Sequence, residues 1–163
     1  MHPTVRAAVR AVMANLAAES IPLFVFEAFR SPVRQEHLFA QGRTEPGKIV
    51  TNADAWASYH QYGLAVDLVF NGPRKWSWEE PSLGMWKRMH AIAAGHGLEP
   101  LSFETPHIQL AGTSSTALQA GRYPPGGYET WAENLAGAIA AWNGDPVVTA
   151  SPAVPERPPL AAG

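Results

Sequence analysis

Residues 58–67 read Ser-Tyr-His-Gln-Tyr-Gly-Leu-Ala-Val-Asp and combine a turn, a strand and two side chains that can bind a metal. The run 63–70 is almost entirely apolar, which predicts a buried strand. Asp67 carries the only charge in this run, and a buried carboxylate is costly unless it is paired or binds a cation. His60 precedes it by seven residues, across a turn that Gly63 favours. We therefore expect His60 and Asp67 to share one site.

A second short stretch, Glu104-Thr105-Pro106-His107, supplies two more side chains of this kind. His60, Asp67 and His107 together make the set of three protein ligands typical of a catalytic zinc, which keeps a fourth position for water. Cysteine is absent, so any metal must be held by nitrogen and oxygen. Glu104 lies three residues before His107, where its carboxylate can take a proton from an activated water. The pattern predicts one zinc ion and the hydrolysis of an amide.

Arg30 follows Leu23–Phe26, an apolar run that predicts a buried strand. A guanidinium at the end of a strand can stabilise a developing oxyanion or hold a substrate carboxylate. The alternative is a structural role, in which Arg30 forms a salt bridge with Glu27.

The order of the predicted elements indicates the fold class. Helices are expected from Pro3 to the break at Ile21-Pro22, from Ser31-Pro32 to Gln41, after Pro81 and Ser82 on a face with Leu83, Trp86, Met89 and Ala93, and near 114–120 and 128–142. A further strand is expected at 107–110, and residues 43–57 are expected to form a long functional loop. Because strands and helices do not alternate regularly, we predict an α+β fold with a small antiparallel or mixed central sheet flanked by helices.

Length and composition favour one domain over residues 1–143 with a disordered tail, rich in proline and alanine, over 144–163. The formal net charge of −2 among 163 residues argues against nucleic acid as a partner. The apolar run 135–142 is too short to span a membrane. The first twenty residues resemble an amphipathic helix more than a signal peptide. We expect a monomer made in the cytoplasm without its own export signal.

The pattern Ser58-x-His60-x-x-Gly63-x-Ala65-x-Asp67, followed by Glu104-x-x-His107, resembles the zinc peptidases of the D-alanyl-D-alanine carboxypeptidase group, which share a Hedgehog-like metal fold. Within that group, residues 38–44 and 46–53 are similar to phage endolysins that cut between L-alanine and D-glutamate in peptidoglycan stem peptides. The resemblance covers about residues 22–110 and implies the same fold for this chain.

The resemblance also implies a role for each matching residue. His60, Asp67 and His107 are expected to bind zinc, Glu104 to act as the catalytic base, Arg30 to contact the substrate or the tetrahedral intermediate, and Ser58 to help bind the substrate. The leading function is then a zinc endopeptidase that hydrolyses the L-alanyl-D-glutamate bond. A D-Ala-D-Ala carboxypeptidase or dipeptidase and a non-catalytic zinc-binding module are the alternatives. The partner would be a peptidoglycan stem peptide, reached after release or delivery of a protein of phage, prophage or related origin.

The remaining candidates receive structural roles. Trp76 and Trp78 alternate at strand spacing and could stack on sugar rings, but packing in the core or at its rim is the favoured interpretation. The other histidines are expected to lie at the surface or to be satisfied by hydrogen bonds, with no ligand role: His2, His37, His90 and His96.

Overall fold

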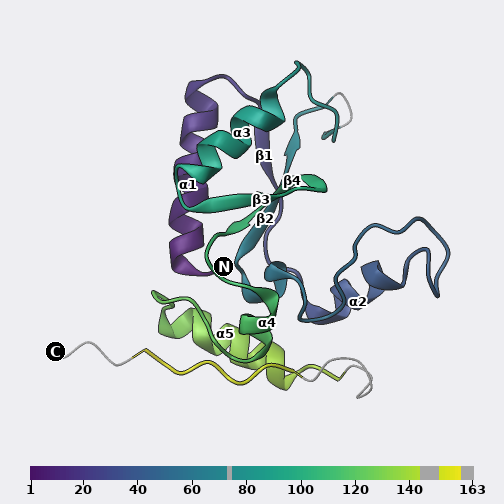
Figure 1. Ribbon diagram of the computed structural model, residues 1–163, viewed down its shortest axis with the longest axis vertical. Helices are drawn as coiled ribbons and strands as arrows, with labels where there is room; N and C mark the ends of the chain where they lie inside the picture. Colours follow the sequence, from purple (N-terminus) through teal and green to yellow (C-terminus); the bar gives the residue numbers. More distant parts are fainter. Residues whose placement is uncertain (73–74, 144–150, 159–163) are drawn as a thin grey trace.

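The structure, a computed structural model, describes residues 1–72, 75–143 and 151–158 (Figure 1). In chain order the elements are α1 (Pro3–Ala18), β1 (Leu23–Glu27), α2 (Pro32–Ala40), the 3₁₀ helix η1 (Tyr59–Tyr62), β2 (Ala65–Phe70), α3 (Met85–Ala94), β3 (Leu98–Leu101), β4 (Glu104–Leu110), α4 (Ser115–Gln119) and α5 (Glu129–Ala140). This order confirms the predicted α+β class.

The four strands form one antiparallel sheet in the order β1-β2-β4-β3. Helices α1 and α3 lie side by side against this sheet (Figure 1) and bury a common core with it. Val66, Leu68 and Phe70 of β2 belong to that core and are fully buried. Residues alternate between the two faces of a strand, so Asp67 and Val69 point to the opposite face. The charged residue of β2 therefore lies away from the α1 and α3 layer.

Three details of the predicted elements are wrong. Strand β3 was not expected, because it is a short edge strand that contains Pro100, a residue tolerated mainly at sheet edges. Helix α3 begins at Met85, and Leu83, expected on its buried face, is 98% exposed. The strand at Leu23–Phe26 is not buried throughout, because β1 is the other edge strand and carries a bulge after Val25.

Residues 151–158 run along α5 (Figure 1). Pro152 and Pro155 are buried, and the Tyr123 hydroxyl donates a hydrogen bond to the Ala153 carbonyl. Arg157 pairs with Glu129 of α5 at 3.7 Å. The domain limit at residue 143 stays a prediction, and the rest of the expected disordered tail, 144–150 and 159–163, lies outside the described residues. No helix in the described part of the chain is long and apolar enough to cross a membrane.

Candidate metal centre

His60 is fixed by the short helix η1 that immediately precedes β2. Ser58 caps this helix, because its hydroxyl accepts from the His60 backbone N–H and its own N–H donates to the Gln61 side chain. Gly63 ends the helix at φ +65°, and a Cβ there would lie 2.8 Å from the Cα of Met1. Glycine is required both for this φ and for the close approach of the N-terminus. The turn therefore directs His60 back towards β2.

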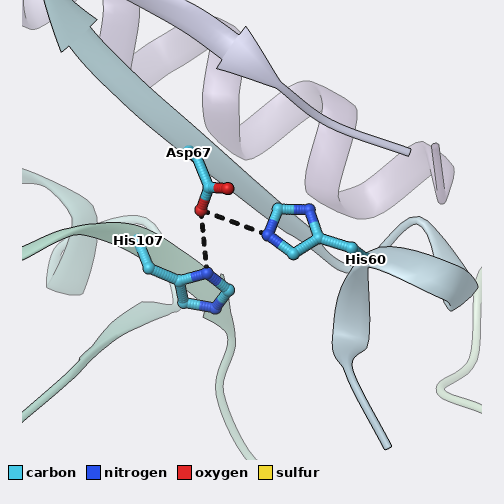
Figure 2. Close-up of side chains that lie close together, drawn as sticks. All are labelled: His60, Asp67 and His107. Atoms are coloured by element: carbon cyan, nitrogen blue, oxygen red, sulfur yellow. Dashed lines mark hydrogen bonds and ion pairs between the residues drawn. The ribbon is translucent and has the colours of Figure 1, made fainter. Parts of the chain in front are cut away.

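Asp67 and His107 are brought together by the sheet, because they are register partners on β2 and β4. The Asp67 Oδ1 atom lies 3.0 Å from Nδ1 of His107 and 3.1 Å from Nε2 of His60 (Figure 2). One candidate ligand atom from each of the three residues lies within 4.8 Å of the other two, and all three residues are buried. The structure thus brings together the three predicted ligands.

The hydrogen bonds of His60 define which ring nitrogen is available. Its Nδ1 atom lies 2.7 Å from the Ala28 carbonyl oxygen. A carbonyl only accepts, so Nδ1 carries the hydrogen and the neutral ring keeps its lone pair on Nε2. That lone pair faces Asp67.

The same reasoning applies to His107. The Gln109 side chain donates to the Glu99 carboxylate at 3.3 Å, so its amide oxygen is the group that faces Nε2 of His107 at 3.0 Å. Nε2 must then donate, and Nδ1 presents its lone pair to Asp67. Two imidazole lone pairs and a carboxylate oxygen converge on one point, and only a cation satisfies all three acceptors. This donor set fits a zinc ion, and the outward N–H bonds have the form that orients histidine ligands in metal sites.

The other carboxylate oxygen of Asp67 is held by Arg30. Nη2 of Arg30 lies 2.9 Å from Asp67 Oδ2, Nε lies 2.8 Å from Glu27, and Nη1 lies 3.0 Å from Gln35. Glu27 thus pairs with Arg30, as the structural alternative predicted. Arg30 still lines the cavity described below, so it combines this pairing with a position next to a substrate.

Two opposing effects set the charge of Asp67. Burial by itself would raise the pKa of the Asp67 carboxyl. Hydrogen bonds and positive charge from His107 and His60, where those rings carry a proton towards Asp67, outweigh burial and hold this pKa well below its usual range. In the neutral rings described above a bound cation would take the place of that proton. Asp67 is therefore ionised at neutral pH and is ready to bind a cation.

A cavity of about 690 Å³ opens onto the cluster and is lined by every other predicted site residue: Arg30, Ser58 and Glu104. Glu104 begins β4, and among the described residues its carboxylate has no hydrogen bond or ion pair. The rim carries exposed apolar side chains from two segments, Ile49 and Val50 of the long loop and Phe103 of the β3–β4 turn. The expected functional loop therefore forms one wall of the cavity.

Several residues that support the cluster were not identified from the sequence. Gln109 and Glu99 orient His107, and Gln35 orients Arg30. A signal existed for Gln109, because a residue two positions after His107 on a strand shares its face. Gln35 lies on a helix distant in sequence and gave no such signal.

The remaining histidines lie outside the cluster. Three of them have hydrogen-bond partners as expected: His37 with Gln41, His90 with the Thr105 carbonyl and His96 with Asn15. The expectation that His2 lies at the surface or is satisfied by hydrogen bonds is wrong. It is fully buried, and neither ring nitrogen makes a hydrogen bond within the described residues. Its ring packs edge-on against Trp131 because the close contact of the N-terminus with Gly63 carries it into the core.

Comparison with known proteins bears on this geometry. The model of the VanY family, D-alanyl-D-alanine carboxypeptidase, matches residues 1–112. This range includes all four strands of the sheet and the three candidate metal ligands. The chain belongs to this family. VanY-family proteins are metallopeptidases, and the buried group of His60, Asp67 and His107 could bind the metal.

One relative of this VanY-family chain is named as a peptidoglycan endopeptidase. It is 44% identical over 68 residues to the peptidoglycan L-alanyl-D-glutamate endopeptidase CwlK of Bacillus subtilis, a match covering 42% of this chain and 41% of that protein. The chain thus spans less than half the length of that relative.

Solved structures share the fold. The L,D-carboxypeptidase DacB from Streptococcus pneumonia is 22% identical with a TM-score of 0.52, covering 71% of this chain and 69% of that one. The LD-carboxypeptidase LdcB is 18% identical with a TM-score of 0.54, covering 71% of this chain and 61% of that one.

Proposed function

We propose that the protein is a zinc-dependent peptidoglycan endopeptidase that hydrolyses the L-alanyl-D-glutamate bond of cell-wall stem peptides. The observation that carries the proposal is the convergence of two imidazole nitrogens on Asp67 Oδ1, with both histidines lining a cavity that Glu104 also lines. His60, Asp67 and His107 would hold one zinc ion. A bound zinc would polarise the substrate carbonyl and make water acidic enough to lose a proton near pH 7.

The chain's own residues perform the proton transfers. The Glu104 carboxylate takes a proton from the water whose oxygen attacks the carbonyl carbon of L-alanine. It then gives that proton to the amine nitrogen of D-glutamate as the carbon–nitrogen bond breaks. Arg30 and Ser58 contact the substrate from the cavity wall, and Arg30 also keeps Asp67 in place.

The choice of bond rests on the relative that cuts between L-alanine and D-glutamate and on the loop that forms the cavity wall. Arg43 fixes this loop, since its guanidinium donates to the carbonyls of Phe39 at 2.7 Å and Thr51 at 3.1 Å. The loop is therefore a defined surface next to the cluster, which supports a role in substrate choice.

A D-Ala-D-Ala carboxypeptidase or dipeptidase is the second candidate, supported by the description of the matching family. It would use the same zinc site and the same base. A non-catalytic zinc module ranks lower, because structural zinc sites normally have four protein ligands and no base is needed beside them. We further propose that the protein acts on the wall as a monomer, after release or delivery from the cytoplasm.

Mass spectrometry of purified peptidoglycan after digestion tests the proposal, with the zinc-loaded protein and a chelator-treated control. New N-terminal D-glutamate on the released peptides, seen only with the zinc-loaded protein, is the expected result. Loss of a terminal D-alanine would instead assign the carboxypeptidase activity. No zinc-dependent product of either kind would contradict both assignments.

A further inference from the structure

Three aromatic side chains outside the cavity form a compact exposed cluster: Phe26 of β1 with Trp76 and Trp78, which follow β2. The ring centroids of Phe26 lie 5.2 Å from Trp76 and 5.1 Å from Trp78, and the two tryptophan rings are 5.5 Å apart. The exposed fractions are 41% for Phe26, 44% for Trp76 and 43% for Trp78. Aromatic side chains that only fill a core are buried more completely.

The tryptophans lie on the same face of the sheet as Asp67. Ser77 is the register partner of Phe70, so these two share the face that packs on α1 and α3. Trp76 and Trp78 flank Ser77 and therefore point to the other face, which is the face of Asp67.

Phe26 reaches this face through the bulge in β1. Val25 pairs with Leu68 and Glu27 pairs with the next residue of β2, Asp67. Phe26 is therefore the extra residue of the bulge and has no partner of its own on β2. A bulge of this kind redirects a side chain. Glu27 is the register partner of Asp67, and adjacent strands are about 4.8 Å apart. Phe26 is thus next in sequence to the residue that pairs with Asp67, and Trp76 and Trp78 flank the partner of Phe70, which lies three residues along β2 from Asp67.

The chemistry of the cluster suits a ligand that is apolar on one face and polar at its edge. Aromatic faces are electron-rich and attract the weakly positive C–H groups of a flat, saturated ring. Among the described residues, no group accepts a hydrogen bond from the indole N–H of Trp76 or Trp78, so both remain available for hydroxyl or amide oxygens of a ligand. A pyranose ring presents this combination.

We propose that Phe26, Trp76 and Trp78 form a binding platform for a sugar ring of the peptidoglycan glycan strand, on the face of the sheet that carries the candidate metal centre. The inference rests on the proposed function and extends it to a second part of the same substrate. The platform continues the face of the sheet that carries the candidate metal centre, so one substrate molecule can contact both.

The position of the platform fits one scissile bond better than the other. The stem is joined to a sugar of the glycan strand at its L-alanine end, so the L-alanyl-D-glutamate bond is the stem's peptide bond nearest to that sugar. The D-Ala-D-Ala bond lies three residues further along the stem, about 10 Å in an extended chain. A sugar site on the same face as the metal centre therefore suits the first cleavage better.

Binding of glycan strands from which an amidase has removed all stem peptides tests the platform. Isothermal titration of the zinc-loaded full chain should show binding, and Trp76→Leu and Trp78→Leu should each weaken it by about tenfold, because leucine keeps apolar cover but offers no flat ring. Tyr128→Leu is the matched control, since Tyr128 is an exposed aromatic on the N-cap of α5, and it should bind as the wild type does. Thermal unfolding verifies that each variant is folded.

Kinetics separate this inference from the proposed function. Both tryptophan variants should cleave a sugar-free stem peptide at the wild-type rate and show a raised KM only on glycan-attached stems. If the wild type cleaves neither substrate, the proposed function fails while the titration still decides the platform. Three results would overturn the platform: no glycan binding by the wild type, tryptophan variants that bind as tightly as the wild type, or binding of anionic lipid vesicles that the tryptophan variants lose.

Discussion

Two regions of the molecule bury histidine side chains, and they differ in how the rings are satisfied. In the candidate metal centre, both nitrogens of His60 and of His107 have partners, and one nitrogen of each ring faces Asp67. At the N-terminus, His2 is equally buried, but its ring packs on the edge of Trp131 and neither ring nitrogen has a hydrogen-bond partner among the described residues. Burial alone therefore does not make a metal ligand. What marks the candidate metal centre is the convergence of two imidazole nitrogens on one carboxylate oxygen.

Removing a ring from the metal centre should have the largest effect. His107→Ala should abolish stoichiometric zinc binding and lower activity by roughly 10⁴-fold, because the polarising cation is lost. Metal analysis of the purified variant and an assay on stem peptides measure both effects. His2→Ala is the matched removal of a buried histidine and should keep its zinc. Full zinc occupancy in His107→Ala would show that the ligand set is wrong.

Removing the base should separate catalysis from metal binding. Glu104→Gln keeps the shape of the side chain but cannot take a proton, so activity should fall by about 10³-fold while zinc content stays at one per chain. Thr105→Ala, at the next position of β4, serves as the control for local structure. A Glu104→Gln enzyme with near-normal turnover would refute the assignment of the base.

Removing Gln109, the hydrogen-bond partner of His107, should leave a ring nitrogen of His107 unpaired, as both ring nitrogens of His2 are. Gln109→Leu leaves Nε2 of His107 without its acceptor, and loss of such an outer partner lowers metal affinity by roughly 10-fold to 100-fold. Competition with a zinc chelator measures the affinity. Glu99→Gln should have a smaller effect, because it keeps an oxygen that can accept from Gln109. Unchanged zinc affinity in Gln109→Leu would mean that His107 is not oriented in this way.

Acid should affect the N-terminal histidine through stability. Burial lowers the pKa of His2, and the nearby Pro124 carbonyl, which does not complete a hydrogen bond, offsets only part of that effect. The unfolded chain then binds a proton more readily than the folded chain. Stability is fully present above about pH 6.5 and falls as the pH drops below it, by at most about 1.4 kcal/mol per pH unit.

The variant His2→Phe checks this linkage, because phenylalanine keeps the edge contact with Trp131 but does not titrate. Its free energy of unfolding should depend less on pH between 6.5 and the acid limit of folding than that of the wild type. Urea titrations at several pH values measure the difference. Identical pH dependence in the two proteins would show that His2 does not contribute.

The sequence predicted that Asp67 and His60 lie together because they are close in the chain and because burying a lone carboxylate is energetically costly. A charged residue inside an apolar strand, a glycine turn before it and a histidine seven residues upstream left few structural interpretations of Asp67 and His60. The register that pairs Asp67 with His107 could not be predicted. Their placement near each other could be expected once the two strands were taken to be neighbours in the sheet.

Other features depend on contacts between distant segments. Gln35 reaches Arg30 only through the packing of α2, and the burial of His2 follows from the approach of the N-terminus to Gly63. The exposed aromatic platform depends on a bulge in β1, and neither a bulge nor an edge position has a clear sequence pattern. Strand β3 was missed because its proline and glutamate lower its strand propensity, which pairing with β4 overrides.

X-ray absorption spectroscopy at the zinc edge of the zinc-loaded protein tests the central claim most directly. The account predicts one zinc with two imidazole nitrogens and a carboxylate oxygen at about 2.0–2.2 Å, and an additional oxygen from water. Loss of one imidazole contribution or of the bound zinc in His60→Ala should follow, with no change in His2→Phe. A zinc environment with no imidazole, or one that His60→Ala leaves intact, would contradict the account.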